Sequence, residues 1–96
     1  MKVYQISFDL RQQRSYQALF KLLQSYANWA RPLESCWVIV TNKSTGEVRD
    51  DLAKVVDADD GLLVARLWGE AAWQKLNGDA ANHMTDWLKQ YLNQPV

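Results

Sequence analysis

The chain has little of several features that would point to common classes of protein. Only one of its 96 residues is cysteine, Cys36, so an intrachain disulfide and a cysteine-based zinc site are both excluded. Eleven basic residues balance eleven acidic ones, and a formal net charge of zero gives no overall attraction to nucleic acid. The four glycines form no phosphate-binding loop.

The sequence also lacks a long apolar run. Gln5, Ser7 and Asp9 interrupt the apolar stretch near the N-terminus, which excludes a secretory signal core and a membrane span there. The composition, 48% hydrophobic and 23% charged, is typical of a globular domain, and 96 residues suffice for one core. With its single cysteine, we expect a cytoplasmic protein of one domain that has no contact with a membrane.

Apolar periodicity in the first half predicts a strand, a helix and two further strands. Residues 3–10 alternate as a half-buried strand does, and residues 16–26 carry apolar side chains at helical spacing. Residues 28–33 contain Pro32, which favours a short or irregular edge segment. Residues 35–42 are apolar and rich in β-branched side chains, so they predict a strand with cover on both faces.

The second half predicts a helix, a strand and a separate C-terminal helix. Ser44 and Glu47 have the spacing of a capping box for a helix that runs to about residue 56. The acidic stretch 57–61 predicts a turn into an apolar strand at 62–68. After Asn77 and Gly78, Asp79 can cap a helix with an apolar stripe formed by Ala81, Met84, Trp87, Leu88 and Tyr91.

This order predicts an α+β fold of the ferredoxin-like βαββαβ type over residues 1–68, with residues 69–96 as a C-terminal extension that contains an amphipathic helix. Two helices would cover one face of the sheet. We expect the other face to carry six residues: Gln5, Ser7, Asp9, Ser35, Trp37 and Ile39. Trp37 and Ile39 need cover there, from a second copy of the chain or from the C-terminal helix, in cis or across a dimer.

Over residues 2–68 the chain resembles a known family. The resemblance rests on "VYQISFDL" with Asp9, a following amphipathic helix, "PLESCWVIV", a capped helix and "DDGLLVARL". In order and spacing these segments are similar to the small CRISPR-associated protein of the spacer-acquisition complex, and to its relatives, virulence-associated protein D and the SinR-family proteins. The resemblance does not extend to the tail beyond residue 68.

The resemblance implies a homodimer in which the aspartate after the first strand meets its twofold counterpart. In family members that are nucleases, this pair holds a divalent metal, Mg²⁺ or Mn²⁺, for phosphodiester hydrolysis. Asp9 matches that aspartate as metal ligand and catalytic residue. Ser35 matches the serine of the serine-x-aromatic element, with Trp37 in place of phenylalanine, and is the second candidate catalytic residue. No small-molecule cofactor is implied.

Three arginines are candidates for RNA binding. Arg11 and Arg14 follow Asp9 and could hold phosphate, and Arg31 lies close to Trp29 in the sequence, where bases could stack. For the arginines, the alternative interpretation is a solvated surface. For Asp9, the alternative is a turn or a cap before the following helix.

Two hypotheses about function follow. The first is a cytosolic, homodimeric, metal-dependent endoribonuclease that uses Asp9 from both chains, with Trp37 and Ile39 in the dimer interface. The second is a non-catalytic dimerisation or protein-binding module, which the neutral charge and the abundance of tryptophan favour.

Overall fold

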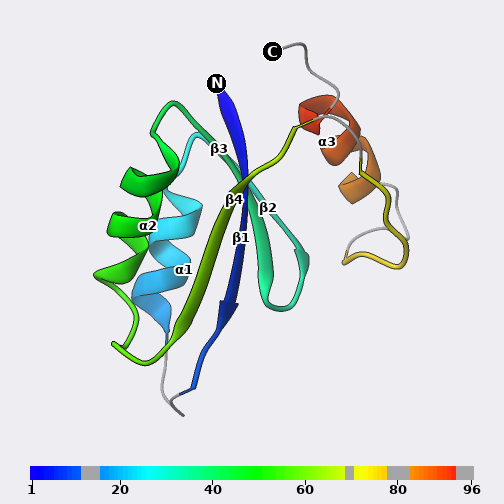
Figure 1. The fold of residues 1–96 in the computed structure, drawn as a ribbon. Coiled ribbons are helices and arrows are strands. Elements are labelled where there is room, and N and C mark those ends of the chain that lie inside the picture. The colour runs from blue at the N-terminus through cyan, green and yellow to red at the C-terminus, as the bar shows by residue number, and fades with distance from the viewer. Residues whose placement is uncertain (12–15, 69–70, 78–82, 93–96) are drawn as a thin grey trace.

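The fold is a four-stranded antiparallel sheet with helices on both faces (Figure 1). The computed structural model describes residues 1–11, 16–68, 71–77 and 83–92. The elements are β1 (Lys2–Asp9), α1 (Gln17–Gln24), β2 (Asn28–Leu33), β3 (Cys36–Thr41), α2 (Thr45–Ala53), β4 (Gly61–Arg66) and α3 (His83–Leu92). The strand order is β2-β3-β1-β4. The predicted α+β class is confirmed.

The main core lies between the sheet and the pair α1 and α2. Tyr4 and Ile6 of β1 point into it, and their exposures of 1% and 0% show complete burial. From α1 the buried residues include Leu19 and Leu23, at the helical spacing that the sequence indicated. Since the buried side chains Leu19 and Leu23 lie on the same side of α1, the helix packs with that side on the sheet.

Helix α2 begins with the predicted capping box. The Ser44 hydroxyl accepts a hydrogen bond from the backbone N–H of Glu47 at 3.2 Å, and the Glu47 carboxylate accepts one from the backbone N–H of Ser44 at 3.0 Å. This backbone hydrogen bond from Ser44 stabilises the carboxylate and lowers the pKa of Glu47. The helix ends at Ala53, earlier than the predicted end near residue 56.

The two faces of β3 are reversed relative to the sequence-based expectation. Trp37 lies opposite Ile6 and Ile39 lies opposite Tyr4, so both side chains point toward α1 and α2. Their exposures are 2% and 0%, which leaves no surface for a partner to cover. The prediction that Trp37 and Ile39 lie on the open face of the sheet, the face away from α1 and α2, was therefore wrong. Their assignment to a dimer interface loses its basis. Alternation alone could not orient a strand that is apolar on both faces.

The second face of the sheet is covered in part by α3 of the same chain. Val3, Val38 and Val40 form a smaller buried cluster with Leu88 of α3. The half-buried residues around this cluster include Met84, Trp87 and Tyr91, three members of the predicted helical stripe. Figure 1 shows α3 beside one end of the sheet, away from α1 and α2. The predicted cap Asp79, together with Gly78 and Ala81, lies outside the described residues.

The two edge strands differ in how they are protected. The pairing of β2 with β3 is irregular between Ala30 and Leu33, around Pro32, as the sequence predicted. The backbone N–H of Asn77 also donates to the carbonyl of Pro32 at 2.9 Å, so the C-terminal segment contacts this edge. At the outer edge of β4, no backbone hydrogen bond occurs among the described residues.

Among the helices in the described ranges, none combines the length and the apolar character needed to cross a membrane.

Candidate functional site

Asp9 is the last residue of β1 and pairs with Gly61, the first residue of β4. Its side chain is 74% exposed, and its Oδ2 atom lies 3.4 Å from Nε of Arg11. Asp9 borders a surface hollow of about 350 Å³ that is lined by Ser7, Phe8, Asp9, Gly61, Leu62 and Leu63. A carboxylate that is this exposed is accessible to an ion or a partner from solvent.

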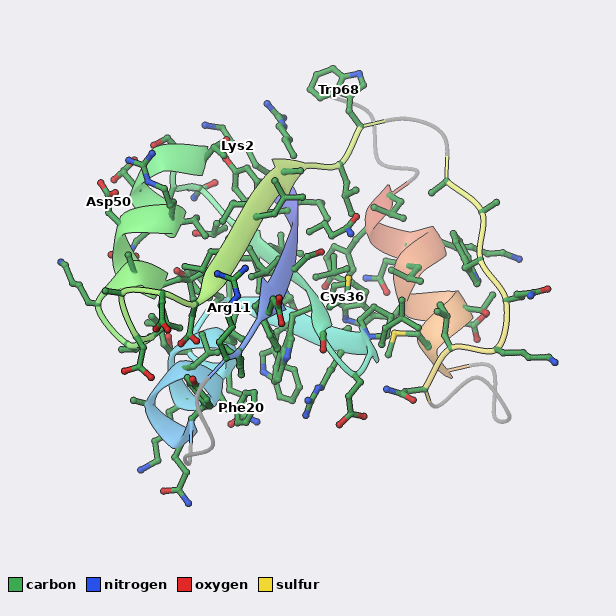
Figure 2. All side chains as sticks on the ribbon, turned by 60° about the horizontal axis from the view of Figure 1, so that its bottom comes forward. Lys2, Arg11, Phe20, Cys36, Asp50 and Trp68 are labelled. Carbon is green, nitrogen blue, oxygen red and sulfur yellow. The ribbon has the colours of Figure 1, made fainter. Side chains whose placement is uncertain are left out.

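Arg11 connects the segment after β1 to the turn before β4 through hydrogen bonds. Its Nη1 atom donates to the carbonyl of Asp59 at 2.6 Å, and its backbone N–H donates to Oδ1 of Asp60 at 2.8 Å. A Cβ atom on Gly61 would lie 3.2 Å from Nη2 of Arg11 and 3.4 Å from Cβ of Asp9. Glycine at this position therefore leaves room for the guanidinium, which Figure 2 shows beside β1 and β4.

The acidic stretch before β4 is a hydrogen-bonded turn, as its sequence indicated. The Asp60 carboxylate accepts from the backbone N–H of Asp57 at 2.8 Å and from the Tyr16 hydroxyl at 3.1 Å. The backbone N–H of Asp60 donates to the carbonyl of Asp57 at 3.1 Å, which closes the turn. Within the described part of the chain, no group of three or more acidic, histidine or cysteine side chains is arranged to hold a metal ion.

Ser35 lies in the turn between β2 and β3, and its carbonyl accepts from the backbone N–H of Phe8 at 3.2 Å. This contact brings the turn alongside the end of β1, so Ser35 and Asp9 belong to the same end of the sheet.

Two of the three candidate RNA-binding arginines, Arg11 and Arg31, lie at opposite edges of the sheet. Arg11 lies beside β4 and Arg31 belongs to β2, and these strands are the opposite edges of the sheet. The Arg31 guanidinium lies over the rings of Phe20 and Trp37, at 5.0 and 5.5 Å from their centroids. It also donates to the carbonyl of Glu34 at 2.7 and 3.0 Å. Arg14 is outside the described residues.

Three side chains lie together on the open face of the sheet, Gln5, Ser7 and Cys36, and the sequence did not predict that they would be neighbours. Gln5 Nε2 donates to the Ser7 hydroxyl at 3.1 Å, and Cys36 lies opposite Ser7 in the β1–β3 ladder. Burial raises the pKa of the Cys36 thiol, against the smaller lowering effect of hydrogen bonds with Ser7 and Gln5. Cys36 is a free cysteine and is half-buried. The sequence could not place Cys36 beside Ser7, because this depends on the register of β1 against β3.

The second feature that sequence reasoning missed is an exposed apolar surface along β4. Leu63 is 62% exposed and Trp68, just beyond the strand, is 58% exposed. Figure 2 shows Trp68 projecting from the body of the molecule. Its ring contacts Arg66, whose guanidinium carbon lies 4.5 Å from the ring centroid. The apolar character of this segment predicted a strand but did not indicate that the strand would lie at an edge of the sheet.

Comparisons of the chain with protein-family models, with curated proteins and with solved structures found no match.

Proposed function

We propose that the protein is a self-associating module of the ferredoxin-like fold that forms a homodimer through the β4 side of its sheet. The order β2-β3-β1-β4, with α1 and α2 as the two crossovers, supports the ferredoxin-like assignment. The observation that carries the functional proposal is the exposed Leu63 on the outer strand β4. This strand is an apolar edge with no backbone partner on its outer side among the described residues.

The contrast between the two edges supports this proposal. Exposed strand edges promote association, and proteins commonly protect them with proline, irregular pairing or a covering segment. The β2 edge has all three, through Pro32, the irregular register and Asn77. In β4 no proline occurs, and its single charged residue, Arg66, is the last of the strand. The β4 edge is therefore the one that is suited to a partner.

Replacing Leu63 with lysine should weaken self-association by at least about tenfold. Burial of a leucine side chain contributes about 1.5–3 kcal/mol, and a twofold contact would bury it in both copies. The measurement is sedimentation equilibrium over a range of protein concentrations. The matched control is Leu33→Lys, because Leu33 is 49% exposed and lies at the end of β2. It should leave association unchanged.

A wild-type chain that stays monomeric at millimolar concentration would contradict the proposal. So would a dimer that Leu33→Lys and Leu63→Lys weaken equally, because the contact would then not depend on β4.

A second candidate function is metal-dependent hydrolysis of RNA at Asp9, and the exposure of this carboxylate beside the hollow favours it. One carboxylate is too few ligands for Mg²⁺ or Mn²⁺, and the described residues of one chain do not gather a metal-binding group. Such a site would need Asp9 from a second copy. The ion would then polarise the phosphate and activate water.

Asp9→Asn tests this second candidate in an RNA cleavage assay with Mg²⁺ or Mn²⁺. The change keeps the shape of the side chain but removes the charge that binds the ion, so it should abolish cleavage. Asp50→Asn is the matched control, because Asp50 is also exposed and paired with a nearby arginine, Arg49, at 2.9 Å. Equal cleavage by wild type and Asp9→Asn, or none by either, would remove the candidate.

A further inference from the structure

We infer that two copies of the chain pair their β4 strands with each other, in antiparallel direction and centred on Leu63, to form one continuous sheet. This inference rests on the proposed self-association and specifies its geometry. In this register Leu63 faces Leu63 of the partner subunit, Leu62 faces Val64, and Arg66 faces Asp60.

The backbone of β4 presents the required hydrogen-bonding groups. The N–H of Leu67 donates to the carbonyl of Val3 at 2.9 Å, and the antiparallel register pairs Ala65 with Gln5 and Leu63 with Ser7. Because hydrogen-bonded residues alternate along an antiparallel strand, the odd-numbered residues direct their backbone groups toward β1. The even-numbered residues Leu62, Val64 and Arg66 therefore direct theirs outward, away from β1.

A twofold axis perpendicular to the sheet pairs these outward groups with each other. Such an axis keeps each face of the sheet on the same side in both copies, so even-numbered residues meet even-numbered residues. With Leu63 at the axis, both Leu62 and Val64 are within the paired region. A second copy thus provides hydrogen-bond partners for the backbone groups on the outer edge of β4, as β1 does for those on its inner edge.

Charge selects both the direction and the register. The turn before β4 is acidic, with Asp57, Asp59 and Asp60, whereas the strand ends at the exposed Arg66. Antiparallel pairing places the basic end of each copy against the acidic end of the other, while parallel pairing would bring like charges together. A shift of two residues in one direction places Arg66 opposite Leu62, and in the other opposite Ala58. Both shifts lose the pairing with Asp60.

The neighbourhood of the edge leaves room for the side chains of a second strand. A hollow of about 260 Å³ lies between the first turns of α2 and β4, and it is lined by Thr45, Gly46, Arg49, Leu62, Leu63 and Val64. The partner's Val64, opposite Leu62, faces this side of the sheet.

This dimer keeps the two Asp9 carboxylates apart. Asp9 lies on β1, so the two residues are separated by three strand spacings, about 14 Å at about 4.8 Å each. They would also lie toward opposite ends of the paired region. The inferred dimer therefore cannot share one metal ion between the two copies of Asp9.

Disulfide trapping tests the register directly. In a Cys36→Ser background, Leu63→Cys places two thiols opposite each other, at a Cα separation of about 4.5 Å that allows a disulfide. Ala65→Cys is the matched control on the same face. In this register residue 65 lies opposite residue 61 of the second copy, so the two cysteines would be four residues apart along the strands. Under mild oxidation we expect Leu63→Cys to form covalent dimers and Ala65→Cys to remain monomeric on a non-reducing gel.

A second variant tests the charge contact without a new thiol. Arg66→Glu places like charges opposite each other at both ends of the paired strands, and it should weaken the dimer by at least tenfold in sedimentation equilibrium at low salt. If the wild type forms a dimer but Leu63→Cys does not cross-link, the inferred pairing is wrong and self-association by another surface stands. If Ala65→Cys cross-links as well as Leu63→Cys, the register is wrong. A monomeric wild type overturns the proposed function as well.

Discussion

Replacing Trp37 with alanine should lower the free energy of unfolding by about 3–5 kcal/mol, a large part of the total stability of a small domain. Trp37 is 2% exposed and stacks on Phe20 at a centroid distance of 6.0 Å. Trp29 packs on it at 5.3 Å. Its loss would leave a large cavity beneath α1. Urea denaturation followed by circular dichroism measures the effect.

Trp37→Phe should be far milder, within about 1.5 kcal/mol of the wild type. The indole Nε1 is buried and has no hydrogen-bond partner among the described residues. A buried polar group without a partner costs about 1–3 kcal/mol, so removing it offsets part of the lost packing. Trp68→Ala is the control for the loss of an indole, since Trp68 is 58% exposed and should change stability by about 0.5 kcal/mol or less. A Trp37→Phe variant as unstable as Trp37→Ala would show that the indole N–H has a partner.

Leu88→Ala should lower the free energy of unfolding by about 2–5 kcal/mol. Leu88 is 4% exposed and is the residue of α3 that completes the cluster with Val3, Val38 and Val40. Without it, α3 retains only half-buried contacts with the sheet. Lys89→Ala is the control, because Lys89 is the next residue on α3 and is exposed. It should leave stability within about 0.5 kcal/mol of the wild type.

The dependence on protein concentration distinguishes two ways in which α3 could act. Since α3 packs on the sheet of its own chain, the effect of Leu88→Ala should be the same at micromolar and at near-millimolar concentration. A destabilisation that varies with concentration would mean that α3 covers the sheet of a second copy.

Features set by local sequence were predicted well. The stripe on α1 follows from apolar residues at helical spacing, and the capping box of α2 from two residues three positions apart. Pro32 also predicted the irregular edge, because proline lacks the backbone N–H that the hydrogen bonds of a β-ladder require. Each of these features depends on residues that are neighbours along the chain.

The candidate site was predicted only in part. The sequence placed Asp9 at a strand end, but it gave no indication that Arg11 contacts Asp59 and Asp60, because these residues are nearly fifty positions apart. It also grouped Arg31 with Arg11 as a candidate for RNA binding, whereas Arg31 lies on the opposite edge strand and contacts the ring of Phe20. Contacts between distant segments depend on how the strands are ordered in the sheet.

By itself, the sequence determined the helices, the capping box of α2, the strand segments and the polar face of β1, since periodicity and capping act within a few residues. Only the tertiary structure decided which face of β3 packs beneath the helices. Cys36, Val38 and Val40 alternate with Trp37 and Ile39, so both faces are apolar, and pairing with β1 makes the choice. The open edge at β4 was decided in the same way, because an edge is defined by the absence of a neighbouring strand and not by the strand's own residues.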